Sequence, residues 1–280
     1  MVRRTTITRL GEGVDARRRL LPVPITRVRN CLSDYRRELE TLGAERALLV
    51  ATSAVRDAEN GEAFLGEIEW SYGFTTRLLS GEEEAELTLR GVGAVGEQTI
   101  VIDIGGGSTE LIGPVVRVST DLGSVRLTER FLESDPPTTG ELEGLASGIR
   151  AVLEEHDLSA RHGIGVAGTV TSLAALDLGL VEHDPERVHG HRLSREGVEK
   201  QLARLAAMPL AERREVPGLE PERAPVIVAG AAILLEVMRH FGLEEVEVSE
   251  RDILDGAALE AAALPEPVEG DAPPGAYTCC

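Results

Sequence analysis

Lysine is almost absent from this sequence, since Lys200 is the only one among its 280 residues. A P-loop needs a lysine directly after its glycines, a protein kinase needs one on a strand, and Schiff-base enzymes use one as nucleophile. Lys200 lies in a polar stretch with helical periodicity and matches none of these positions. Any anion bound by this chain must therefore be held by arginine, by backbone N–H groups or by a metal ion.

Positive charge and aromatic side chains are also scarce. The chain has 29 Lys and Arg against 48 Asp and Glu, a formal net charge of -19, and only 3% aromatic residues. Proteins that bind nucleic acid need a basic face to displace phosphate counterions, and single-strand binders need aromatic side chains for stacking. We therefore expect no nucleic-acid partner. A hydrophobic share of 42% is ordinary for a globular protein, and the length predicts two domains.

Cysteine is rare, and long apolar runs are missing. Cys31, Cys279 and Cys280 form neither a disulfide framework nor a zinc-binding spacing, which predicts a reducing cytoplasm. No signal-peptide core and no apolar run of about 18 residues is found, so no membrane partner is expected.

The periodicity predicts an α/β fold. In the first third we expect a strand-like stretch at Thr5–Thr8, a turn at Gly11–Gly13 and a helix from Ile25 to Gly43. A buried strand at Ala47–Thr52 and a capped helix from Ser80 onwards follow. An antiparallel meander follows, with strands at Ile100–Ile104, Glu110–Ile112 and Val115–Val118. Later helices are expected near 138–156, 169–178, 195–207, 224–241 and from about 252, with a strand at 246–248. We expect domains at 1–97 and 98–264 and an unstructured tail at 265–280.

The first glycine loop is the most specific segment. Gly105, Gly106 and Gly107 join two strands, so their N–H groups can converge on an anion, and the hydroxyls of Ser108 and Thr109 add donors. Asp103, at the end of the first strand, is placed to hold a divalent cation or to orient water. The alternative is a glycine-rich hairpin turn without a ligand.

The second glycine loop runs from Gly165 through Gly168 and Thr169 into a helix. Counted from Gly163, it fits the dinucleotide pattern G-x-G-x-x-G, but that pattern requires a strand before its first glycine and a surrounding βαβ unit. A loop whose N–H groups face a phosphate at a helix N-terminus explains it better. Tight packing alone is the other explanation.

Six segments in order resemble the exopolyphosphatase / guanosine pentaphosphate phosphohydrolase (Ppx/GppA) family, in its short two-domain form. They are Thr8–Asp15, Ala51–Asp57, Ser80–Glu86, the Asp103 loop, Gly165–Thr171 and Ser249–Gly256. The resemblance runs from about residue 5 to 263. It implies two actin-like domains with a cleft between them, and it leaves a homodimer open.

The resemblance also implies roles for individual residues. Glu84 would activate the attacking water, and Arg56 would line the phosphate channel. Asp103 and Glu110 would organise Mg²⁺ or Mn²⁺ and water, and the glycine loops would hold successive phosphates. From the residues alone, the run Glu82 to Glu84 is interpreted instead as a structural helix start, where the helix dipole favours acidic residues.

One departure from the family concerns the beginning of the chain. The family's first hairpin, with its Asp-x-Gly-Thr-Asn-Ser phosphate loop, has no counterpart in this sequence. We therefore expect a truncated first domain, an open strand edge near Thr5–Thr8, and a chain that is feebly active and prone to aggregate.

The activity implied is release of orthophosphate from the end of inorganic polyphosphate. Hydrolysis of guanosine pentaphosphate is the alternative within the family, and the net charge favours short substrates. A catalytically weak paralogue that binds polyphosphate or nucleotide, and a sugar kinase of the same fold, stay open as well.

Overall fold

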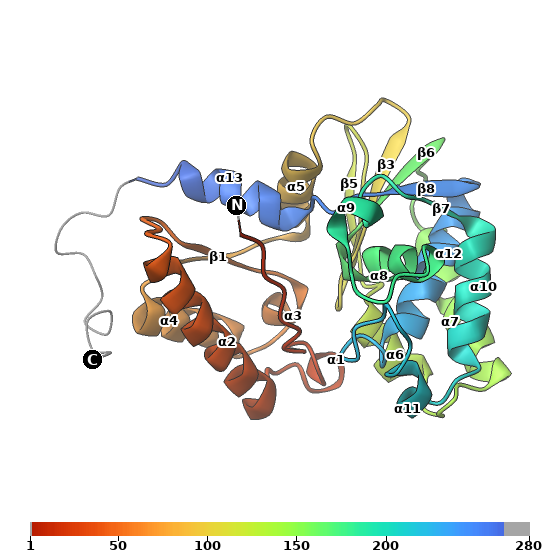
Figure 1. Ribbon diagram of the computed structural model, residues 1–280, viewed down its shortest axis with the longest axis horizontal. Coiled ribbons are helices and arrows are strands. Elements are labelled where there is room, and N and C mark those ends of the chain that lie inside the picture. Colours follow the sequence, from red (N-terminus) through yellow and green to blue (C-terminus); the bar gives the residue numbers. More distant parts are fainter. Residues whose placement is uncertain (1, 266–280) are drawn as a thin grey trace.

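The computed structural model describes residues 2–265, so the predicted unstructured tail at 265–280 lies, apart from Pro265, outside the described residues. The strands of the described chain form two separate sheets (Figure 1). One is a parallel pair built from the first 78 residues, and the other is a mixed six-stranded sheet that begins at Thr99. The predicted division at residues 97 and 98 falls between the two sheets, and it stays a prediction because the last helix crosses back over it.

The N-terminal part contains the small sheet and several helices. Its elements are α1 (Val14–Arg17), α2 (Pro22–Thr41), β1 (Leu48–Ala51), α3 (Ser53–Arg56), α4 (Gly61–Tyr72), β2 (Thr75–Leu78) and α5 (Gly81–Val92), of which α5 packs on the large sheet. The predicted helix from Ile25 begins three residues earlier, with Pro22 in its first turn, where a missing N–H costs nothing. The Ser80 capping box is confirmed, because Ser80 and Glu83 each bond the other's backbone N–H.

The large sheet contains the predicted meander. Its strands are β3 (Thr99–Ile104), β4 (Thr109–Ile112), β5 (Arg117–Thr120), β6 (His162–Val166), β7 (Arg192–Ser194) and β8 (Glu245–Val248), in the order β5-β4-β3-β6-β8-β7. β3, β4 and β5 are antiparallel neighbours, as expected, while β3 and β6 run parallel. The ends of β3 and β6 therefore lie side by side, and Gly105–Gly107 and Ala167–Thr169 follow directly from these ends.

Helices α6 (Ser124–Phe131) to α12 pack with the large sheet and form the main core with it. The others in this group are α7 (Thr139–Leu153), α8 (Ala167–Asp177), α9 (Pro185–Val188), α10 (Arg195–Ala206), α11 (Leu210–Arg213) and α12 (Ile227–Phe241), and the last helix of the described chain is α13 (Ile253–Ala262). α12 is buried from Ile227 to Met238. Across residues 2–265 no helix is both long and apolar enough to span a bilayer.

Helix α13 returns from the large sheet and packs on α5 of the N-terminal part (Figure 1). The two backbones approach closely through two glycines. A Cβ on Gly91 would lie 1.9 Å from the Asp252 carbonyl oxygen, and one on Gly256 would lie 1.9 Å from the Leu87 carbonyl oxygen. Only glycine allows this crossing, which joins the last segment of the chain to the helix that carries Glu84.

The prediction of a strand at Thr5–Thr8 is wrong. The segment is irregular because its polar groups bond helices instead of a strand: Tyr35 donates to the Thr6 hydroxyl, and Arg27 donates to the Thr8 carbonyl. Thr6 and Thr8 line a largely apolar cavity of about 590 Å³ between α2, β1 and α13. Within residues 2–265, β1 and β2 pair only with each other, so each of them has an unpaired edge.

The glycine contact predicts a stability effect of position 256. A Gly256→Val variant forces the two helices apart, and we expect the free energy of unfolding to fall by about 1–3 kcal/mol, measured by denaturant titration. Gly66→Ala is the matched control, because a Cβ on Gly66 in α4 meets nothing within 4 Å. That variant should be neutral or stabilising by up to about 1 kcal/mol. Equal losses in the two variants would contradict the close-contact explanation.

Candidate active site

Helix α6 holds the first glycine loop through hydrogen bonds to the carbonyl groups of the loop. The N–H groups of Ser124 and Val125 donate to the carbonyls of Gly105 and Gly106 at 3.0 and 2.9 Å, and the Ser124 hydroxyl also reaches Gly105. With its carbonyls turned to α6, the loop leaves the N–H groups of Gly106 and Gly107 without an acceptor among residues 2–265. These two donors lie at the cleft wall, which is the arrangement expected of an anion site.

The loop needs glycine because two other segments approach it. A Cβ on Gly107 would lie 2.5 Å from the Ser53 hydroxyl, and one on Gly123 would lie 2.3 Å from the Gly106 carbonyl oxygen. Ser53 belongs to α3 in the N-terminal part, so the close approach at Gly107 brings the two parts of the chain together. A plain hairpin turn would not need this contact.

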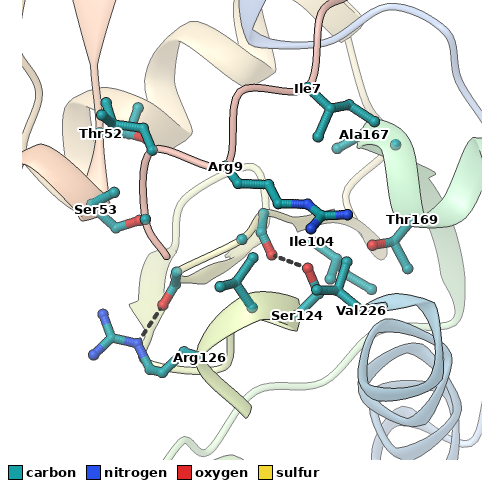
Figure 2. Close-up of a pocket in the computed structure, with 18 of the residues that line it drawn as sticks. Ile7, Arg9, Thr52, Ser53, Ile104, Ser124, Arg126, Ala167, Thr169 and Val226 are labelled. Atoms are coloured by element: carbon teal, nitrogen blue, oxygen red, sulfur yellow. Dashed lines mark hydrogen bonds between the residues drawn. The ribbon is translucent and has the colours of Figure 1, made fainter. Parts of the chain in front are cut away.

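Both glycine loops line a single cleft of about 360 Å³ (Figure 2). Thr52, Ser53 and Asp57 form part of one wall, and Gly105–Gly107 with Ala167–Thr169 form part of the other. Of the residues expected to bind substrate, Gly105, Gly106, Gly107, Gly168 and Thr169 line this cleft.

The remaining predicted site residues lie behind the cleft wall. Thr109 is fully buried and its hydroxyl donates to the Leu122 carbonyl, so it points away from the cleft. Arg56 donates to the Leu79 carbonyl at 2.6 Å and lies 3.4 Å from Glu84 Oε2. Ser108 is buried, and its hydroxyl lowers the pKa of the Glu110 carboxyl. Thr52 connects the two layers, because it lines the cleft and its hydroxyl also lowers the pKa of Glu84.

Three buried carboxylates come together beneath the cleft. Asp103 and Glu110 are opposite each other on β3 and β4, on the face that α5 covers with Glu84 and Thr88. The Thr88 hydroxyl donates to Asp103 at 2.9 Å, and the Ser119 hydroxyl donates to Glu110 at 2.8 Å. The strand register and the packing of α5 thus bring Glu84, Asp103 and Glu110 together, although they lie up to 26 positions apart in the sequence.

Burial raises the pKa of each of these carboxyls to about 7. For Asp103 the negative charge of Glu110 adds to the desolvation, and for Glu110 the charge of Glu84 does so. Arg56 opposes the increase at Glu84. A carboxyl with a pKa near neutrality can exchange a proton at physiological pH, as a general base must.

The acidic cluster has the chemistry for a hard divalent cation. Its donors are all oxygen, which suits Mg²⁺ or Mn²⁺. Within residues 2–265, no group of three or more His, Cys, Asp or Glu side chains is arranged to hold an ion by itself. Mg²⁺ is usually held by one or two carboxylates together with substrate phosphates and water. Asp103 and Glu110 have the donor chemistry for such an ion, and both lie beneath the cleft rather than in its lining.

Arg126 is the main site residue that the sequence reading missed. Its guanidinium donates to the Gly107 carbonyl at 2.7 Å and to Asp15 at 2.7 Å, and it also pairs with Asp57 (Figure 2 shows the Gly107 bond). The partners lie 111 and 69 residues away along the chain. Because no local pattern marks such a contact, Arg126 looks like any arginine of an amphipathic helix.

The second glycine loop differs from the expectation in one respect. Gly163 and Gly165 lie inside β6, where a Cβ would strike Val246 or Val170, so these two glycines serve packing. Helix α8 starts directly after the strand, at Ala167, whose φ of 65° is in the left-handed region. Strain of this kind at a non-glycine residue concentrates at functional sites.

Comparison with known proteins assigns the chain to a family. Residues 1–263 match the Ppx/GppA phosphatase family, and this chain belongs to that family. It is 38% identical to exopolyphosphatase 2 of Mycobacterium tuberculosis, over 93% of this chain and 88% of that protein. It is 29% identical to a guanosine-5'-triphosphate,3'-diphosphate pyrophosphatase of Aeromonas hydrophila, over 89% of this chain and 51% of that protein.

The solved structure of an exopolyphosphatase-like protein superposes with a TM-score of 0.87 at 33% identity, covering 93% of this chain and 91% of that one. The family and the actin-like α/β fold that the resemblance implied are thereby confirmed.

The raised pKa values predict how stability depends on pH. In the unfolded chain the three carboxyls ionise near pH 4, whereas in the folded chain they hold protons until about pH 7. Between these values the folded state binds more protons, so the cluster's contribution to stability falls as pH rises towards 7. In metal-free buffer, as the pH is raised from 5 to 8.5, the free energy of unfolding of Glu84→Gln should rise by about 1–3 kcal/mol relative to that of the wild type. Glu82→Gln, at an exposed position, should show no such change in denaturant titrations.

Proposed function

We propose that this chain is an exopolyphosphatase that hydrolyses the terminal phosphoanhydride bond of inorganic polyphosphate and releases orthophosphate. The observation that carries the proposal is that one site combines two free N–H donors, those of Gly106 and Gly107, with a buried carboxyl at Glu84 whose pKa is near neutrality. The similarity to exopolyphosphatase 2 of M. tuberculosis supports the same reaction.

Each part of the site has a step in this reaction. The loop N–H groups and the N-terminus of α8 hold the terminal phosphate and stabilise the charge on its oxygens as the bond breaks. Glu84 accepts the proton of the attacking water, and Arg56 fixes the carboxylate from behind while Thr52 links it to the cleft. Asp103 and Glu110 would hold Mg²⁺ or Mn²⁺, which neutralises phosphoryl charge when it is bound.

Guanosine pentaphosphate is the second candidate substrate, because the A. hydrophila relative is a guanosine-5'-triphosphate,3'-diphosphate pyrophosphatase. A net charge of -19 repels long polyanions at a distance, which favours short substrates. The cytoplasmic location and a homodimer belong to the proposal as well, the first supported by the scarcity of cysteine.

The general base can be tested by one substitution. Glu84→Gln keeps the size of the side chain but removes the proton acceptor, so kcat for phosphate release should fall by roughly 10²–10⁴ with little change in substrate affinity. Glu82→Gln changes an exposed glutamate two residues away and should retain wild-type turnover. If both variants lose the same activity, the acidic run is only a dipole-matched helix start.

A substrate panel tests the reaction itself. Phosphate release is measured with Mg²⁺ from polyphosphates of several lengths, from guanosine pentaphosphate and from ATP. We expect the highest kcat/KM for short polyphosphate, because it brings terminal phosphate to the loop with the least long-range repulsion. A chain that prefers guanosine pentaphosphate is the nucleotide phosphohydrolase. Tight polyphosphate binding without release from any substrate would identify a binding paralogue.

A further inference from the structure

Three arginines line the cleft, and they differ in how their charge is balanced. Arg126 is bonded to two aspartates, Asp15 and Asp57, and Arg223 is paired with Glu220. Arg9 has no carboxylate within ion-pair distance among residues 2–265, and its Nη2 donates only to the Glu222 carbonyl, at 2.8 Å. Of the three, Arg9 is the one whose positive charge is available to a ligand.

The side chain of Arg9 places this positive charge inside the cleft. Figure 2 shows its side chain extending across the cavity towards Thr169, with Ala167 on one side and Ile104 below. The residue itself comes from the segment before α1, in the N-terminal part of the chain. Arg9 thus reaches from one wall of the cleft to the mouth of the second glycine loop.

The backbone at Arg9 is held in an unfavourable conformation. Its φ of 51° lies in the left-handed region, as does that of Ala167 on the opposite wall. For a non-glycine residue this region is disfavoured, so glycine or asparagine would suit the turn better. The turn is closed by the Glu12 N–H donating to the Arg9 carbonyl at 3.1 Å. The strain is explained if the long cationic side chain is needed at this point.

We propose that Arg9 is a substrate-binding residue that grips a phosphate oxygen from the N-terminal wall, opposite the glycine loops. With one N–H on Glu222, four of the five guanidinium N–H donors remain, enough for a bidentate bond to phosphate. The inference rests on the proposed function and deepens it: the ligand is a chain of at least two linked phosphates, one at the glycine loops and the next at Arg9.

Binding and turnover of inorganic tripolyphosphate test this role. Affinity is measured by calorimetry with Ca²⁺ in place of Mg²⁺, and KM and kcat by phosphate release with Mg²⁺. Arg9→Gln should weaken tripolyphosphate binding and raise KM by about 10- to 100-fold, while kcat changes less. Arg9→Lys should recover part of the affinity, because lysine keeps the positive charge but lacks the planar guanidinium that can donate two hydrogen bonds to one phosphate. Orthophosphate, which reaches only one subsite, should bind equally to wild type and Arg9→Gln.

Arg4→Gln is the matched control, because Arg4 lies in the same segment but is exposed and pairs with Glu38 outside the cleft. It should bind tripolyphosphate as wild type does, and melting temperatures of all three variants show whether the fold is retained. Wild-type affinity in a folded Arg9→Gln, or equal losses in Arg9→Gln and Arg4→Gln, overturns the inference and leaves the proposed function standing. If the wild-type chain neither binds nor hydrolyses tripolyphosphate, both fail together.

Discussion

The guanidinium of Arg126 holds three segments at one point, and the shape of the cleft depends on it. One edge bonds the Gly107 carbonyl, and the other bonds Asp15 and Asp57 from the N-terminal part of the chain. A buried arginine with all its partners in place is stable, whereas one that loses them would be an uncompensated buried charge. The Gly107 carbonyl is therefore bonded by the same guanidinium that joins the two parts of the chain, while helix α6 holds the carbonyls of Gly105 and Gly106.

Negative charge prevails over the chain as a whole, whereas arginines line the cleft. The chain as a whole carries -19, and three of its carboxylates are buried within one cluster, which costs free energy that packing elsewhere must offset. The cleft beside that cluster is lined by Arg9, Arg126 and Arg223. Because salt screens exposed charges beyond about 8 Å, a phosphate inside the cleft is affected mainly by these neighbours, and the overall charge acts on its approach.

Local patterns predicted most of the elements that carry the site. The antiparallel meander, the Ser80 capping box and the helix that begins after Gly165 were all readable from turn residues and periodicity. Thr5–Thr8 was misread, because a run of β-branched residues predicts a strand only if a partner strand is beside it. Strand β6 was not recognised, since its glycines suit a loop and are explained only by Val170 and Val246 packed against them.

The sequence by itself determined the chemistry available to this protein: no lysine for a P-loop, two glycine loops, and acids at Glu84, Asp103 and Glu110. Only the tertiary structure decided how these groups act. The register between β3 and β4 sets Asp103 opposite Glu110, and the α5 face that packs on them adds Glu84, so that desolvation raises all three pKa values to about 7. Arg126 and Arg9 acquire their roles in the same way. The partners Asp15 and Asp57 of Arg126 and Glu222 of Arg9 are more than 60 residues distant, and such distances are bridged only when the chain folds.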